Sequence, residues 1–195
     1  LVCGSVVLDV ISKHKFYGGT GANIAYGLGQ LEARPLLFSL VGKDFNKDFR
    51  QHLEKSGVSN CVFVDSKNNT AKFSYSVNKH GIGNGIWSPN AYKNIDKLRI
   101  TKTISVDDLE NISFAIFSPG NAKSTLAHIS EFKKINKKAT VIFDPGQMIT
   151  SYTKNQFIKC MNMSEILILN DLEYKQLGKI LGKDPVLFFK KINKI

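Results

Sequence analysis

A glycine-rich turn that leads directly into a helical pattern is the segment of the sequence best suited to binding a ligand. It reads GGTGANIA over residues 18–25. Consecutive glycines let the backbone come close to a ligand, and the free N–H groups of a helix start favour electronegative atoms. Asn23 would add its side-chain amide from the first helical turn. The G-x-G-x-x-G spacing of dinucleotide-binding turns is absent. The segment is therefore either a ligand-binding turn or a tight strand–helix connection.

Two aspartates follow apolar runs that are typical of strands. Asp9 follows the run at 1–8 and Asp144 follows the run at 140–143. Open parallel sheets bind ligands at the carboxyl ends of their strands. A carboxylate at the end of the first strand can accept two charge-assisted hydrogen bonds from a ligand. The alternative for Asp9 is a turn or N-cap aspartate.

Two further pairs have both a site interpretation and a structural one. Asn170 and Glu173 stand three residues apart before an apolar helical pattern, which is the spacing of a capping box. Gly42 and Asp44 follow another apolar run. We expect Gly42 to allow a close backbone approach, and Asp44 either to serve a site or to cap a helix.

Apolar runs alternate with helical patterns along the chain, which predicts an α/β fold with a mainly parallel sheet covered by helices on both faces. Strands are expected at 1–8, 36–41, 113–118, 140–144 and 165–169, and helices at 22–31, 46–55, 122–138, 154–163 and 171–181.

One region departs from this alternation. Apolar residues occupy every second position over 71–78, which is typical of a half-exposed strand. The glycine-rich stretch at 80–85 follows and predicts a turn, so a projecting hairpin is expected. Phe73, Tyr75 and Trp87 either offer flat apolar faces to a ligand or pack against one another within the hairpin.

The composition is that of a globular chain, with 43% hydrophobic and 22% charged residues. No apolar run approaches the roughly 20 residues that a membrane span needs. The formal net charge is +11, but no basic–aromatic interleaving or nucleic-acid-binding motif accompanies it, so solvated lysines are favoured over a nucleic-acid surface. Three widely spaced cysteines do not form a disulfide framework, which favours a reduced, cytoplasmic protein.

Four motifs in this order resemble the ribokinase-like (PfkB) kinase family. They are GSVVLD at 4–9, GGTGANIA at 18–25 continued by VGKD at 41–44, FDPGQ at 143–147 and ILNDLE at 168–173. The resemblance implies a ribokinase-like three-layer α/β/α sandwich with a small β-lid. The last two motifs look most like the adenosine or nucleoside kinase branch.

The resemblance also implies a function. It predicts an ATP-dependent kinase that uses Mg²⁺ to phosphorylate a hydroxyl of a small-molecule sugar or nucleoside, with an adenosine-like acceptor favoured. The acceptor would be bound by Asp9, Gly18, Gly19 and Asn23. Asn170, Glu173 and Asp144 would lie near Mg²⁺ and phosphate without binding the metal directly, and Gly42 and Asp44 belong to the same signature. Lids that pair between subunits would make the protein a homodimer.

Three departures from the family pattern affect these expectations. Only eight residues separate Asp9 from Gly18, so either the lid is reduced or residues are absent. Glu32 stands where the family usually has Gly or Ser. The family's distal G-A-G-D segment, which carries the catalytic aspartate, is missing, and we expect that aspartate beyond Ile195.

These departures predict that residues 1–195 are an N-terminal part of a kinase, incomplete at its C-terminal end, with lid segments near 10–17 and 71–92. No catalytic residue is expected within the chain, so we expect it to be inactive by itself. A non-catalytic sugar- or nucleoside-binding module is the alternative.

Overall fold

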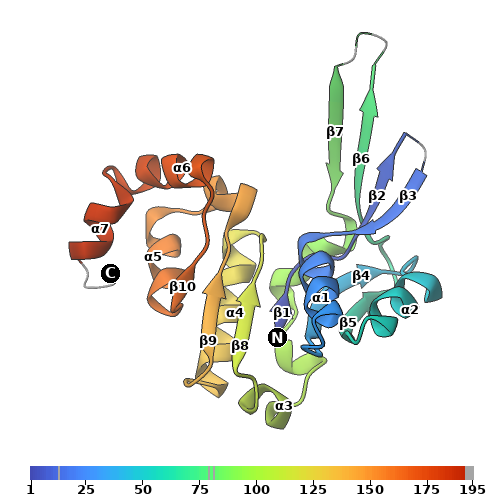
Figure 1. The fold of residues 1–195 in the computed structure, drawn as a ribbon, viewed down its shortest axis with the longest axis horizontal. Helices are drawn as coiled ribbons and strands as arrows, with labels where there is room; N and C mark the ends of the chain where they lie inside the picture. The colour runs from blue at the N-terminus through green and yellow to red at the C-terminus, as the bar shows by residue number, and fades with distance from the viewer. Residues whose placement is uncertain (13, 79, 81, 192–195) are drawn as a thin grey trace.

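Six parallel strands form the central sheet of the protein, in the order β10-β9-β8-β1-β4-β5 (Figure 1). The computed structural model describes residues 1–12, 14–78, 80 and 82–191. The strands are β1 (Val2–Cys3), β4 (Leu36–Gly42), β5 (Ser59–Asp65), β8 (Phe114–Phe117), β9 (Thr140–Phe143) and β10 (Ile166–Leu167).

Helices cover both faces of this sheet. Strand β4 divides its side chains between them: Leu37 and Val41 pack under α1 and α2, while Phe38 joins the larger cluster under α4 and α5. The predicted three-layer α/β/α fold is therefore confirmed. The helices are α1 (Thr20–Gln30), α2 (Lys47–Lys55), α3 (Val106–Glu110), α4 (Ala122–Ile135), α5 (Lys154–Asn162), α6 (Asp171–Leu181) and α7 (Pro185–Lys191), with 3₁₀ segments η1 (Asn90–Lys97), η2 (Ile100–Lys102) and η3 (Gly146–Ser151).

A second sheet of four strands, in the order β3-β2-β6-β7, projects from the side of β1 and β4 (Figure 1). Its strands are β2 (Val7–Ile11), β3 (His14–Gly18), β6 (Ala71–Val77) and β7 (Gly83–Ser88). Two antiparallel hairpins, β2–β3 and β6–β7, join through the parallel pair β2–β6. The β2–β3 turn is tight, because Ile11 pairs with His14. The short spacing between Asp9 and Gly18 is thus sufficient for a complete hairpin.

The expectation of one strand over 1–8 is wrong. The chain leaves the central sheet after Cys3 and enters the second sheet at Val7. The change of sheet is made where Gly4 lies against Gly21 of α1: a Cβ built on Gly21 would lie 2.7 Å from the Gly4 Cα. Asp9 consequently lies in the middle of β2 and not at the carboxyl end of a central strand.

The glycine-rich stretch at 80–85 is also only partly a turn. Gly83 and Gly85 belong to β7, where they leave room for aromatic rings of β6. A Cβ on Gly85 would lie 2.8 Å from the Phe73 ring, and one on Gly83 would lie 2.7 Å from the Tyr75 ring. Gly81 lies outside the described residues. Two of the expected turn glycines are therefore packing positions within a strand.

Glu32 lies in a strained backbone conformation at the end of α1. It follows α1 with a φ of 61°, in the left-handed region that disfavours residues with a Cβ. The turn is closed by a hydrogen bond of 2.9 Å from the Glu32 N–H to the Gly29 carbonyl. Glu32 therefore strains the backbone at this position, but the turn after α1 still forms.

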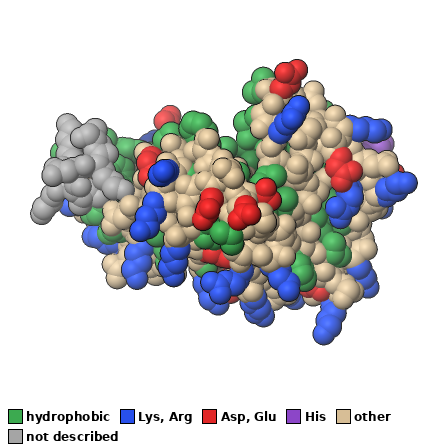
Figure 2. Space-filling view, turned by 90° about the horizontal axis from the view of Figure 1, so that it is seen from below, with side chains coloured by type: hydrophobic (Ala, Val, Ile, Leu, Met, Phe, Trp, Pro, Cys, Tyr) green, Lys and Arg blue, Asp and Glu red, His purple; other side chains and the backbone are tan. Residues whose placement is uncertain are grey.

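The surface is basic without a single continuous patch on the face seen in Figure 2. Lys and Arg side chains are spread over the length of that face, and Asp and Glu side chains lie among them. Three ion pairs, such as Lys133–Glu165 at 2.8 Å, link charges within the described part of the chain. Within that part, no helix has the length and apolar character needed to cross a membrane.

The contact between Gly4 and Gly21 gives a direct test of this fold. We expect Gly21→Ala to lower the free energy of unfolding by about 1–3 kcal/mol, because its methyl group would overlap the Gly4 backbone. Gly27→Ala is the matched control in the same helix: nothing lies within 4 Å of its added Cβ. Its helix propensity should raise stability by up to about 1 kcal/mol. Urea unfolding measures both, and equal effects would contradict the packing described.

Candidate functional site

The carboxyl ends of the parallel strands bring several sequence motifs to one edge of the central sheet. Hydrogen bonds continue the ladder one residue past the strands: the Ser118 N–H donates to the Cys3 carbonyl at 2.9 Å, and the Asp144 N–H donates to the Phe117 carbonyl at 3.0 Å. The ends of β1, β8 and β9 therefore lie side by side, about 5 Å apart from strand to strand.

Asp9 faces Gly18 across the β2–β3 hairpin. A Cβ built on Gly18 would lie 2.8 Å from Asp9 Cγ, so only glycine leaves room for the carboxylate there. Asp9 is half-buried, and burial raises the pKa of its carboxyl above the ordinary value of 3.8. No other described residue donates a hydrogen bond or forms an ion pair with it. The carboxylate is thus partly desolvated and available to a ligand.

The start of α1 lies between the two sheets. Gly19 precedes the helix with a φ of 99°, which only glycine adopts readily. Ser5 caps the helix start, because its hydroxyl accepts from the Thr20 N–H at 3.2 Å and its carbonyl accepts from the Ala22 N–H at 3.1 Å. Behind it, the Thr20 hydroxyl lies 3.2 Å from the Ser5 hydroxyl and 3.1 Å from the Ser118 hydroxyl. Asn23 follows in the first turn and is exposed. The hydroxyls gathered here and the exposed Asn23 amide suit a polar ligand.

Gly42 and Asp44 serve the loop that precedes β6. The close backbone approach expected at Gly42 is made to this loop, since a Cβ on Gly42 would lie 2.5 Å from the Asn68 carbonyl oxygen. The Asp44 carboxylate accepts a 2.6 Å hydrogen bond from the Thr70 N–H. The helix-cap alternative for Asp44 is wrong, because Asn46 caps α2. These two residues tie the end of β4 to the second sheet.

Asn170 and Glu173 form a complete capping box at the start of α6. The Asn170 side chain accepts from the Glu173 N–H at 2.9 Å, and the Glu173 carboxylate accepts from the Asn170 N–H at 3.0 Å. The second Glu173 oxygen accepts from the Asn170 amide at 2.9 Å. Both carboxylate oxygens therefore already have a donor. The motif therefore caps α6, as its structural interpretation predicts. A role near an ion would be additional to this cap.

Asp144 lies at the end of β9, near Glu173. Its pKa is raised, first by burial and then by the negative charge of Glu173, while a hydrogen bond from the Gly146 N–H lowers it in part. No group of three or more His, Cys, Asp or Glu side chains that could enclose a metal ion occurs among the described residues. Asp144 and Glu173 offer negative charge to a cation that keeps most of its water ligands.

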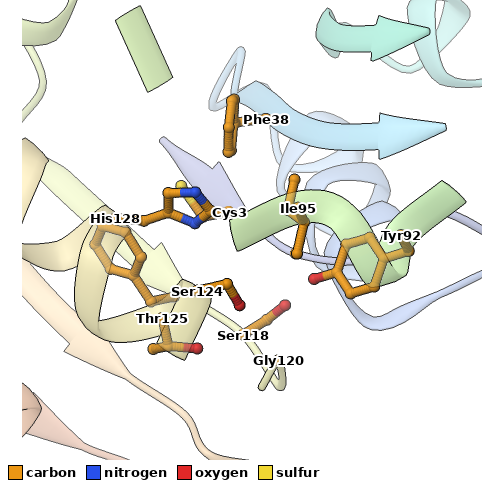
Figure 3. A pocket seen from close by; sticks show the side chains of 11 residues that line it. Cys3, Phe38, Tyr92, Ile95, Ser118, Gly120, Ser124, Thr125 and His128 are labelled. Atoms are coloured by element: carbon orange, nitrogen blue, oxygen red, sulfur yellow. The ribbon is translucent and has the colours of Figure 1, made fainter. Parts of the chain in front are cut away.

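A small enclosed cavity lies beneath this edge, between α4 and η1 (Figure 3). Its volume is about 10 Å³, the space of one water molecule, so it is too small for a sugar. His128, Tyr92 and Ser118 are among its lining residues. The His128 Nε2 lies 2.8 Å from the Leu98 carbonyl oxygen. Burial lowers the pKa of His128 below 6.5, so the ring is neutral at pH 7.

The comparison with known protein families settles which family has this arrangement. The profile of the pfkB family carbohydrate kinases matches residues 4–194. The chain belongs to this family. Its solved relatives share the fold: the nucleoside kinase of Methanocaldococcus jannaschii, described as an archaeal member of the ribokinase family, superposes with a TM-score of 0.84 at 21% identity, covering 97% of this chain and 66% of that structure.

Further pfkB-type relatives are also nucleoside kinases. The Burkholderia thailandensis nucleoside kinase, solved with inosine, gives a TM-score of 0.80 at 19% identity over 96% of this chain and 65% of that one. In sequence, the M. jannaschii nucleoside kinase is 26% identical over 90% of this chain and 55% of its own length. A nucleoside kinase of Methanothermobacter thermautotrophicus is 27% identical over 86% and 53%. The chain spans about half the length of these curated relatives.

The predicted site residues fall into three groups in this pfkB chain. Asp9, Gly18 and Gly19 lie together at the base of the second sheet, with Asn23 one helical turn away. A second group lies at the ends of β9 and β10 and contains Asp144, Asn170 and Glu173. Gly42 and Asp44 hold the loop before β6 instead.

The catalytic aspartate belongs to none of these groups, because it is predicted to lie beyond Ile195. Ile195 is itself one of the residues at 192–195 that lie outside the described part of the chain. The last described element is α7, which ends at Lys191. The place of the catalytic aspartate beyond Ile195 therefore stays a prediction.

Sequence reasoning missed two hydroxyls of the site. Thr20 and Ser118 are 98 residues apart in the chain and meet at 3.1 Å. The available signal was their placement, one within the glycine-rich turn and the other at the end of a predicted strand. Their pairing depends on the order of the strands, which no local pattern contains.

The buried His128 makes stability depend on pH. Its pKa is depressed in the folded state, so the unfolded chain binds the proton first as the pH falls below 6.5. We expect the melting temperature to fall between pH 7.5 and pH 5.5, with a contribution from His128 of up to about 1.4 kcal/mol per pH unit. His128→Gln keeps an amide donor for the Leu98 carbonyl and should show a shallower pH dependence. An unchanged slope in this variant would contradict the assignment.

Proposed function

We propose that the protein is the acceptor-binding part of an ATP-dependent kinase that phosphorylates a hydroxyl of a sugar or nucleoside, with an adenosine-like nucleoside favoured. One observation carries the proposal: the unpaired Asp9 carboxylate faces the Gly18 backbone beside the start of α1. A vicinal diol supplies the two donors that a carboxylate accepts well. The pfkB family match and the nucleoside kinases among the relatives support the same substrate class.

We infer that the second sheet acts as a lid over this site. Asp9 and Gly18 belong to β2 and β3, so movement of this sheet against the central sheet would open or close the acceptor site. Closure would exclude water from phosphoryl transfer. The tie from Asp44 to Thr70 and the change of sheet after Gly4 are the connections that such a movement would pass through.

Asp144, Asn170 and Glu173 fit a position close to Mg²⁺ and the phosphates of ATP. Mg²⁺ usually keeps several waters and binds one or two carboxylates together with substrate phosphates, and when bound it neutralises charge on the phosphates. Asp144 and Glu173 present negative charge without a protein cation beside them in the described part of the chain. Because both Glu173 oxygens accept hydrogen bonds from Asn170, its influence would pass through water.

A non-catalytic sugar- or nucleoside-binding module is the second candidate. One observation favours it: the G-A-G-D segment, which in the family carries the catalytic aspartate, does not occur in these 195 residues. Both candidates bind the acceptor through the same residues and differ only in phosphoryl transfer.

The acceptor site is tested by Asp9→Ala. The variant removes an acceptor of two charge-assisted hydrogen bonds, each worth about 1.5–3 kcal/mol. We expect the affinity for inosine and for ribose, measured by calorimetry, to fall by more than roughly 100-fold. Glu110→Ala, an exposed carboxylate on α3, is the control and should bind normally. Undiminished affinity in the Asp9 variant would remove it from the site.

Catalysis is tested on the same chain. Without the family's catalytic aspartate and anion-binding glycines, we expect the 195-residue chain to bind the acceptor but to transfer no phosphate from ATP to inosine or ribose in the presence of Mg²⁺. A radiolabelled phosphate-transfer assay measures this. Turnover above the rate without protein would show that the residues needed for transfer are all present here.

A further inference from the structure

A stack of aromatic rings joins the second sheet to the helices beside it. Tyr17 of β3 stacks on Phe49 of α2, with ring centroids 4.4 Å apart and an angle of 18° between the ring planes. The Tyr17 ring also lies 5.2 Å from the ring of His52, which follows Phe49 by about one turn of α2. His52 in turn stacks on Tyr26 of α1 at 4.8 Å, with 6° between the ring planes. The stack therefore runs from β3 through α2 to α1.

Tyr17 holds the base of the β2–β3 hairpin on the side that faces away from the Asp9 carboxylate. The strand register pairs Tyr17 with Leu8, and the next pair along the hairpin is Phe16 with Asp9. Because alternate residues of a strand point to opposite faces, the Tyr17–Leu8 pair and Asp9 project from opposite faces of the hairpin. Leu8 packs against the apolar cluster under α1 and α2. The hairpin is thus held against the helices by the residues directly beside Asp9 and Phe16.

The rest of β3 offers little that could replace this contact. Residues 14–16 are exposed, and their side chains make no hydrogen bond, ion pair or ring contact with another described residue. Beyond its base, the hairpin projects away from α1 and α2 (Figure 1). Gly18 follows Tyr17 directly and faces Asp9 across the hairpin. The contact of Tyr17 with α2 therefore fixes where Gly18 lies relative to Asp9.

The stack lies at the surface, although it rests on the core. Tyr17 is 39% exposed and His52 is exposed, whereas Phe49 is buried. Loss of the Tyr17 ring should consequently change how firmly β3 is held more than it changes the stability of the whole chain. When β3 is free to move, only the fraction of molecules with Gly18 in place binds the acceptor, and the apparent affinity falls by that fraction.

We propose that Tyr17 and His52 are positioning residues of the acceptor site, whose ring stack holds β3 against α1 and α2 and keeps Gly18 opposite Asp9. This inference rests on the proposed function, because it takes Asp9 as the residue that binds the acceptor. Tyr17 itself does not touch the acceptor, since it projects from the opposite face of the hairpin. Loss of the stack should therefore weaken every acceptor alike, whatever group is attached to its sugar.

Tyr17→Leu and Tyr17→Phe test this role as a pair. The geometric contribution of an aromatic pair changes an equilibrium constant by roughly 2- to 10-fold. We expect Tyr17→Leu to lower the affinities for inosine and for ribose by this factor, equally for both ligands, as measured by calorimetry. Tyr17→Phe keeps the ring and should bind both ligands within about twofold of the original chain. Equal losses in the two variants would contradict the ring stack, because they would assign the effect to the hydroxyl.

His52→Gln completes a double-mutant cycle. Because His52 reaches β3 through Tyr17, adding His52→Gln to Tyr17→Leu should lower the affinity for inosine no further. Additive losses would contradict the stack, because they would show that the two side chains act independently. Lys15→Ala is the matched control and should bind inosine normally, since Lys15 is exposed on the same strand and projects from the same face as Tyr17.

Amide hydrogen exchange separates positioning from a general loss of stability. In Tyr17→Leu, the amides of β2 and β3 should exchange faster than in the original chain, and bound inosine should slow them again. The amides of β8, in the central sheet, should exchange at an unchanged rate. Faster exchange in both sheets would contradict the proposal, because Tyr17 would then support the fold as a whole.

The positioning role and the acceptor site fail in different ways. If binding of inosine and ribose depends on Asp9 but is unchanged in Tyr17→Leu, the positioning role is wrong and the acceptor site stands. A variant that loses affinity for inosine and keeps its affinity for ribose also overturns the positioning role, because Tyr17 would then contact the ligand. If neither ligand binds in an Asp9-dependent way, both proposals are overturned.

Discussion

The backbone contact between Gly4 and Gly21 is the constraint on which the site depends. It allows α1 to begin directly against the end of β1, with Thr20 between the hydroxyls of Ser5 and Ser118. A side chain at either glycine would separate the helix start from the sheet. The same contact lies where the chain leaves the central sheet, so the first strand of the second sheet starts only a few residues after the glycine. The start of α1 and the Asp9 strand are brought together by one close approach.

A site divided between two sheets has consequences for its electrostatics. The central sheet supplies a helix start and hydroxyls, which are donors and weak dipoles, while the second sheet supplies a carboxylate whose pKa is raised by burial. That carboxylate is less stable as an ion in this position than in water, so a ligand that donates hydrogen bonds to it restores part of the lost solvation. Asp144 and Glu173, at the ends of β9 and β10, lie two and three strands away from β1. Their negative charge is therefore separated from that of Asp9.

Sequence predicted the elements whose signal is local. The helix at 171–181 has the predicted bounds because its N-cap Asn170, its apolar period and the Gly182 that follows it are all local signals. The capping box of Asn170 was likewise readable from spacing alone. The run at 1–8 misled because apolar residues stand on both sides of Gly4 and Ser5, and the two-residue interruption does not show that the second part joins another sheet. The partner of Asp44 is Thr70, 26 residues away, and that pairing depends on how the two sheets join. The contact of Tyr17 with Phe49 was not predicted for the same reason: it depends on how β3 lies against α2.

The ionisation of Asp9 tests the central claim most directly. Carbon-detected NMR of the side-chain carboxyl, recorded as a pH titration with and without inosine, measures its pKa in place. The account requires a pKa above the ordinary 3.8 in the free protein and a lower pKa when the diol donates hydrogen bonds to the carboxylate. A pKa that starts at its ordinary value, or that inosine does not move, would show that this carboxylate neither lies in a desolvated site nor holds the acceptor.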